Sequence, residues 1–203
     1  MSNSPVRVPA RLQGRRSMAD LTNVAWDAFP TNAGPDDVVS ANFKLYELTR
    51  SETATRLLID NSFPGTRELR AAVYLCRNVL EPVRKALGRF SPNSVFRCQE
   101  LERALKKKRS DWTSKSQHTL GQACDIEIPG MPTLELAAWV TKHLKFDQVI
   151  CECYDPAKGP NSGWVHVSIV PPGLGENRKV SLSYVADPTK GKYVYVKGLR
   201  EAA

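Results

Sequence analysis

Apolar residues recur at intervals of three and four positions through the middle of the chain, which predicts helices. The clearest case is a helix over residues 66–87, which Thr66 can cap and Gly88 can end, while Pro82 predicts a kink or break near its end. Its apolar face is formed by Leu69, Val73, Cys76, Leu80, Val83 and Leu87. Shorter helices are predicted over residues 53–59, 98–108 and 133–144.

Alternating apolar and polar residues predict strands in the second half of the chain. These strands are residues 123–128, 148–154, 164–170, 180–185 and 192–196. The last two flank a turn at residues 187–191 and predict a terminal hairpin. Helices before and between strands predict an α+β domain, in which several helices pack on a small antiparallel sheet.

The first forty residues show no sustained periodicity and are rich in Arg, Ser, Asn and Pro. They predict a basic N-terminal arm over residues 1–40, with Arg7, Arg11, Arg15 and Arg16 near its start. The remainder is predicted to be one domain over residues 41–172, with residues 173–203 as its C-terminal hairpin extension. A chain of 203 residues is long enough for one such core.

Composition is typical of a globular protein, with 41% hydrophobic and 25% charged residues. The net charge of +8 favours an acidic partner such as nucleic acid, anionic lipid or an anionic wall polymer, or serves solubility alone. No apolar run reaches the ~20 residues of a membrane span, and no secretory signal is visible, so we expect synthesis and retention in a cytosol. The five scattered cysteines are expected to be reduced and mostly buried.

Two of the three histidines stand beside short polar or glycine residues and predict a metal site. His118 and Asp125 are seven residues apart, across a turn that Gly121 allows to fold tightly. Alternation in residues 164–168 turns His166 away from the core, so that it can supply a third ligand. Two imidazoles and a carboxylate suit Zn²⁺ and leave a position for a water nucleophile, which predicts one catalytic zinc per chain.

These residues carry a resemblance to a known family. Residues 116–125 match the S-x-H-x-x-G-x-A-x-D motif of the zinc D-Ala-D-Ala carboxypeptidase family, and residues 164–166 resemble its second metal motif. Residues 94–101 are similar to its S-G-Y-R-S-x-x-L segment, and residues 42–61 resemble the amino-terminal part of phage-encoded members. The resemblance covers about residues 42–170.

The resemblance implies that His118, Asp125 and His166 bind the zinc ion. It also implies that Arg97 polarises the substrate carbonyl or holds its oxyanion, a role that suits a permanent cation. The alternative for Arg97 is an ion pair with a nearby acid, which is common for surface arginines. The acids in reach are Glu100 and Glu102.

The general base is the main departure from the family pattern. Many relatives carry an acid three residues before the last ligand, where this chain has Gly163. Glu152 is the best replacement, because alternation directs it away from its cysteine neighbours and a hairpin with the Trp164 strand would bring it beside His166. Asp155 is the second choice, and a solvated strand position is the alternative for Glu152.

Three further residues are candidates for supporting roles. Ser116 orients His118 or caps the turn, or is an ordinary turn serine. Trp164 and Tyr154 are candidates to line the substrate groove, although buried aromatic packing is the more common role. His143 and the pair Cys151 and Cys153 are not expected to bind metal.

The family implies a peptidoglycan peptidase of the phage endolysin type, which hydrolyses an amide bond in the stem peptide or crosslink of the cell wall. Such lysins lack a signal and reach the wall from the host cytoplasm through membrane holes made by another protein. A carboxypeptidase that trims terminal D-Ala, or a dipeptidase, is a related possibility. The basic charge would favour the anionic envelope.

A function of another class is also open. The chain can be a virion component that uses a peptidase-like fold for assembly, with its basic arm bound to other virion proteins or to nucleic acid. The glycine at position 163 keeps this hypothesis in view, because it removes the usual acid.

Overall fold

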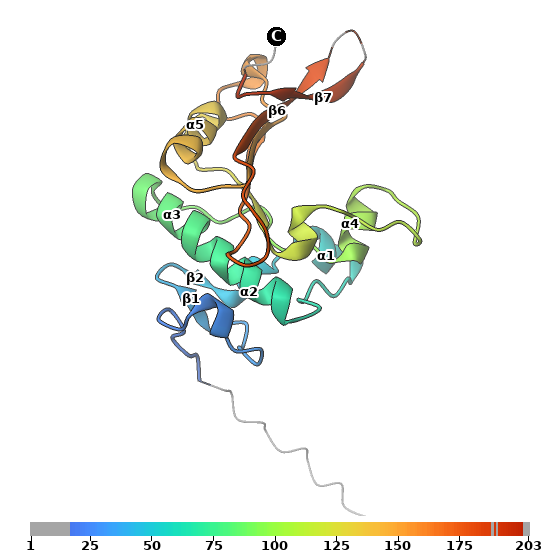
Figure 1. Cartoon of the computed structure of the whole chain (residues 1–203). Helices are drawn as coiled ribbons and strands as arrows, with labels where there is room; N and C mark the ends of the chain where they lie inside the picture. Colours follow the sequence, from blue (N-terminus) through green and yellow to red (C-terminus); the bar gives the residue numbers. More distant parts are fainter. Residues whose placement is uncertain (1–16, 188, 190, 201–203) are drawn as a thin grey trace, which may run out of the picture.

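The fold is built on a five-stranded sheet, seen in a computed structural model that describes residues 17–187, 189 and 191–200 (Figure 1). Its strand order is β3-β5-β4-β6-β7. The strands are β3 (Ala123–Ile126), β4 (Gln148–Glu152), β5 (Trp164–Ser168), β6 (Val180–Asp187) and β7 (Lys192–Lys197). A small antiparallel sheet joins β1 (Val38–Ser40) to β2 (Phe43–Lys44). With its helices, the structure is a mixed α/β fold.

The main sheet is mixed, whereas the sequence predicted an antiparallel one. Strands β4 and β6 pair in parallel, and the other neighbours are antiparallel. The reason lies in the direction of β5, which ends at Ser168 beside Gln148, the first residue of β4. The chain then crosses to the far side of β4 and begins β6 at Val180, also beside Gln148. A strand that starts there must run parallel to β4.

The helices lie on both sides of this sheet, with α5 next to the sheet and α2 and α3 below it in Figure 1. They are α1 (Glu52–Leu57), α2 (Thr66–Leu75), α3 (Glu81–Leu87), α4 (Gln99–Leu105) and α5 (Thr133–His143). Short 3-10 turns occur at η1 (Trp26–Ala28), η2 (Leu45–Leu48), η4 (Gln117–Leu120) and η5 (Pro156–Lys158). Among the described residues, no helix has the length and apolar character to cross a membrane.

The predicted long helix is present as α2 and α3, joined by a π-helical segment, η3 (Cys76–Leu80). Pro82 lies in the first turn of α3, where its missing N–H is tolerated, and the wider π turn before it accommodates the ring. Gly88 ends α3 with a φ of 98°, as the sequence indicated. The cap of α1 is Ser51, whose Oγ accepts a hydrogen bond from the amide of Ala54.

The core lies between α2, α3, α5 and the inner face of the sheet. Val165 and Val167 of β5 are fully buried there, as alternation predicted. All five cysteines are free thiols, and three of them are buried: Cys76, Cys124 and Cys151.

Part of the predicted arm packs into this core. Phe29 and Val39 are fully buried, whereas residues 1–16, which hold the four early arginines, lie outside the described residues. Arg77, on η3, donates hydrogen bonds to the backbone carbonyls of Val39, Val24 and Leu21. One side chain therefore fastens the segment before β1 to the helices.

We expect Arg77→Met to lower the free energy of unfolding by about 2–4 kcal/mol, because three half-buried carbonyls lose a charged donor. Urea denaturation measures this change. Arg67→Met is the control, since Arg67 is exposed and has no partner among the described residues, and it should change stability by less than about 0.5 kcal/mol. Equal effects of the two variants would show that Arg77 does not fasten the segment.

Candidate metal centre

Three side chains predicted as ligands meet at one point, each from a different element. His118 lies on η4, Asp125 on β3 and His166 on β5, and the last two are direct partners in the β3·β5 register. Gly121 ends η4 with a φ of 68°, and a Cβ there would lie 2.3 Å from the carbonyl oxygen of Glu68. Only glycine lets the turn approach α2 this closely, as the sequence pattern required.

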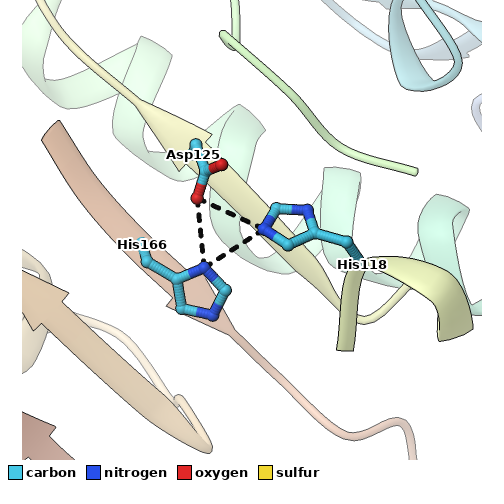
Figure 2. A group of neighbouring side chains, drawn as sticks. All are labelled: His118, Asp125 and His166. Carbon is cyan, nitrogen blue, oxygen red and sulfur yellow. Dashed lines mark hydrogen bonds and ion pairs between the residues drawn. The ribbon is translucent and has the colours of Figure 1, made fainter. Parts of the chain in front are cut away.

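The ligand atoms form a nearly equilateral triangle, shown by the dashed lines in Figure 2. His118 Nε2 lies 3.2 Å from His166 Nδ1, and Asp125 Oδ1 lies 3.3 Å from the first and 3.1 Å from the second. Ligands at 2.0–2.2 Å from a tetrahedral ion are separated by about 3.3–3.6 Å. The triangle therefore matches three corners of such a site to within a few tenths of an ångström.

The ring of His118 is oriented by its second nitrogen. Nδ1 lies 2.7 Å from the carbonyl oxygen of Val95, so it carries the proton and donates it there. With Nδ1 engaged in this way, loss of the proton on Nε2 would leave a lone pair that faces Asp125 and His166. A backbone acceptor behind an imidazole is the usual way in which a metal-binding histidine is held.

The carboxylate of Asp125 is only 6% exposed but stays ionised. Burial opposes its charge, yet the charge of His118, hydrogen bonds with both histidines and the charge of Arg97 hold its pKa well below the usual range. Its second oxygen, Oδ2, is paired with Arg97 Nη2. The other oxygen is therefore available at neutral pH as an anionic ligand.

Arg97 itself is held by neighbours, including one of the two acids weighed from the sequence. Its Nε donates to Ser94 Oγ at 2.7 Å and its Nη1 to Glu102 Oε1 at 3.3 Å. With Asp125, three of its five N–H groups have partners among the described residues. The ion pair expected as an alternative is present, and Arg97 nevertheless lines the cavity over the metal centre.

Glu102 is the acid of this ion pair, and its complete burial is the part that the sequence did not predict. Its side chain is fully buried, and its Oε2 accepts from Lys106 Nζ at 2.5 Å and from Ser114 Oγ at 2.7 Å. Burial opposes its ionisation, but these two hydrogen bonds and the charges of Lys106 and Arg97 outweigh it and lower its pKa. Nothing in the sequence indicated this burial, because an acid on a predicted helix is more often solvated.

Glu152 lies on the sheet face that carries the ligands. In the β4·β5 register Ile150 pairs with His166 and Glu152 with Trp164, so Glu152 is diagonal to His166. Its carboxylate has no hydrogen-bond partner among the described residues and lines the same cavity. Burial, and then the charge of Asp125, raise the pKa of Glu152. An unpaired carboxyl group with a raised pKa is suited to proton transfer.

Neither position 163 nor Asp155 offers a carboxyl group for proton transfer in the cavity. A Cβ at Gly163 would lie 2.1 Å from the carbonyl oxygen of Glu152, and the backbone there has a φ of 72°. An acid at position 163 is therefore excluded by the backbone. The carboxylate of Asp155 caps η5 through the amide of Ala157 and pairs with Lys158, away from the cavity.

The group of His118, Asp125 and His166 opens into a cavity of about 700 Å³. Trp164 lines it, as predicted, and so does Ser116. Ser116 is the residue before η4, and its carbonyl oxygen accepts from Thr119, so it shapes the turn of His118 through its backbone. Tyr154 is only 7% exposed and belongs to the hydrophobic core, so it does not line the cavity as the sequence suggested.

A second buried acid, Asp147, contacts the residue before His118 and was missed in the sequence. It is 1% exposed and accepts from Arg178 Nε at 3.0 Å and from Gln117 Nε2 at 3.0 Å. Gln117 directly precedes His118, and Arg178 lies in the loop before β6, which forms a wall of the cavity. The only sequence signal was an acid just before a strand.

Within residues 17–187, 189 and 191–200, His118, Asp125 and His166 are the one group of three or more such side chains that can hold a metal ion. Cys151 and Cys153 do not belong to such a group. The sequence matches no protein-family model and no curated protein. Chemical inference about the site therefore rests on its geometry and on its motifs.

We expect Gly163→Ala to destabilise the protein by several kcal/mol more than Gly130→Ala. Both glycines have a positive φ, 72° and 79°, so both variants carry the same backbone strain of about 1–2 kcal/mol. Only at position 163 does the new methyl group meet backbone atoms, whereas nothing lies within 4 Å at Gly130. Comparable midpoints of urea unfolding for the two variants would contradict the close approach of β4 and β5.

The lowered pKa of Glu102 makes its contribution to stability depend on pH. A carboxyl group whose pKa is lower in the folded state than in the unfolded state stabilises the folded protein at pH values above the ordinary pKa of 4.5. This stabilisation is lost as the pH falls through the folded-state pKa. Relative to Glu102→Gln, the wild type should therefore be more stable at pH 7, and its advantage should shrink below pH 4.5. A stability difference between wild type and variant that grows as the pH falls would contradict this prediction.

Proposed function

We propose that the protein is a zinc-dependent peptidase that binds one Zn²⁺ per chain through His118, Asp125 and His166. The observation that carries this proposal is the triangle of ligand atoms 3.1–3.3 Å apart, with the tautomer of His118 held by Val95. A zinc ion in such a site supplies a Lewis acid and lowers the pKa of a bound water towards neutrality.

Glu152 serves as the general base in this proposal. It takes a proton from the attacking water and returns it to the leaving amine, which requires a carboxyl group that is ionised but not strongly held by partners. The absence of a hydrogen-bond partner among the described residues and the raised pKa of Glu152 support this role. Gly163, which replaces the acid found in many relatives, supports it as well.

Arg97 holds the substrate carbonyl in the proposed mechanism. Two of its N–H groups have no partner among the described residues, and the side chain lines the cavity. A cation fixed by Ser94, Glu102 and Asp125 loses little freedom when it meets a developing oxyanion. Ser116 and Trp164 line the cavity beside the reacting bond.

The proposed substrate is an amide bond in the stem peptide or crosslink of bacterial peptidoglycan. This part of the proposal rests on the resemblance of residues 94–101, 116–125 and 164–166 to the carboxypeptidase family. A cavity of about 700 Å³ has room for several peptide residues. The net charge of +8 favours the anionic envelope of a host cell, as in a phage lysin.

The test combines zinc analysis with release of soluble fragments from purified peptidoglycan. We expect one zinc per chain in the wild type. His118→Ala should lose both zinc and hydrolysis, whereas Glu152→Gln should keep zinc and lose about 100- to 10,000-fold in kcat, because only proton transfer is removed.

His143→Ala is the matched control for the loss of a histidine. His143 is exposed at the end of α5, where its Nδ1 lies 2.8 Å from the carbonyl oxygen of Trp139, and its replacement should change neither zinc content nor hydrolysis. A folded wild type with no zinc and no hydrolysis would refute the proposal and favour a virion assembly function. Zinc without hydrolysis of any wall peptide would limit the site to a structural role.

A further inference from the structure

A row of side chains crosses four strands on the same face as the metal centre. The strand registers pair Trp164 with Glu152, Glu152 with Tyr184, and Tyr184 with Tyr195. Directly paired residues point to the same face of a sheet, and this face also carries His166, two residues from Trp164. The row therefore leads from the metal centre outward to the hairpin β6–β7, at the edge of the sheet in Figure 1.

The outer end of this row is a cluster of three tyrosines. The ring of Tyr184 lies 4.5 Å from that of Tyr195 and 5.3 Å from that of Tyr193, with interplanar angles of 32° and 33°. Tyr195 is 59% exposed and Tyr193 is 37% exposed. The ring of Tyr184 packs against both others, and the three rings form one aromatic cluster with two exposed members, which we call the tyrosine surface.

Its position on the hairpin indicates a ligand rather than packing. The exposed alternate positions of an edge strand are usually polar or charged, which protects the sheet from aggregation. Here two of these positions in β7 are tyrosines, and their inward neighbours, Val194 and Val196, already face the other side. Tyr195 also lines the cavity of the metal centre, so the tyrosine surface continues directly from that cavity.

The chemistry of the row favours a neutral saccharide. Tyrosine ring faces pack against the C–H faces of sugar rings, and the phenol hydroxyls hydrogen-bond to sugar hydroxyls. The four residues of the row include one carboxylate, Glu152, and no cation, so their own side chains favour a neutral ligand over an anionic one. A ligand with apolar ring faces and neutral polar edges suits both the tyrosine rings and the lack of a cation in the row.

The length of the row matches the proposed substrate. Three strand spacings of about 4.8 Å separate Trp164 from Tyr195, which gives about 14 Å. An extended peptide covers this distance with about four residues. A stem peptide is joined to a sugar of the glycan strand, so an amide bond at the metal centre places that sugar near the hairpin.

We propose that the tyrosine surface formed by Tyr184, Tyr193 and Tyr195 binds the sugar rings to which the peptide substrate is attached. This proposal rests on the proposed function for the identity of the peptide, but the sugar contact has its own test. It makes the hairpin the part of the protein that distinguishes a glycan-linked peptide from a free one.

The experiment compares two ligands by calorimetry: a stem peptide alone, and the same peptide carrying the disaccharide of N-acetylglucosamine and N-acetylmuramic acid. All proteins are zinc-loaded and carry Glu152→Gln, so that no turnover occurs. We expect the parent to bind the sugar-bearing ligand about tenfold more tightly. The double variant Tyr193→Ala with Tyr195→Ala should reduce this ratio of the two affinities to below about threefold.

Two controls separate stacking from damage to the fold. Tyr193→Phe with Tyr195→Phe keeps the rings and should keep most of the ratio. Tyr46→Ala removes a comparably exposed tyrosine, 41% exposed on η2 and outside the cavity, and should leave the ratio unchanged.

A ratio near one in the parent, or a ratio that survives the double alanine change, would overturn the proposal. The two proposals fail differently. Hydrolysis by the wild type without a sugar preference leaves the peptidase and removes the tyrosine surface as a sugar site. A sugar preference without hydrolysis keeps the sugar site and removes the peptidase.

Discussion

The buried carboxylate of Asp125 is the group on which the architecture of the site depends. A charge taken out of water must be compensated, and this one is compensated on both oxygens: by His118 and His166 on one side and by Arg97 on the other. Arg97 in turn requires Glu102, which is fully buried on α4 and has two further partners, Lys106 and Ser114, in the segment after that helix. The network therefore connects the edge strand β3 to α4.

Strand β5 gives this network its geometry, because it is the neighbour of both β3 and β4. One register places His166 beside Asp125, and the other places Trp164 beside Glu152. The parallel pairing of β4 with β6 extends the same face to the terminal hairpin. Strand order thus places the proposed ligands on β3 and β5, the proposed base and the tyrosine surface on one face of the sheet, although they are far apart in the sequence.

Local chemistry and alternation were sufficient to predict His118, Asp125 and His166 as neighbours, since a turn and two short strands carry them. The same alternation failed at Tyr154, because Cys153 has a φ of 57° and ends the extended backbone of β4. The parallel pair could not be predicted either, because strand order is set by packing between distant segments. Glu102 was named as a possible partner of Arg97, but its burial could not be predicted, because the Ser114 segment that covers it lies outside its own helix.

Gly163 stands where the resemblance led us to expect an acid, and the backbone around it explains the glycine. The carbonyl of Glu152 occupies the space that a side chain at position 163 would need, so the ends of β4 and β5 lie closer than an acid there permits. That close approach also sets the register in which Glu152 faces Trp164. The constraint that excludes a side chain just before β5 therefore also places Glu152, at the end of β4, in register with Trp164 and on the lining of the cavity.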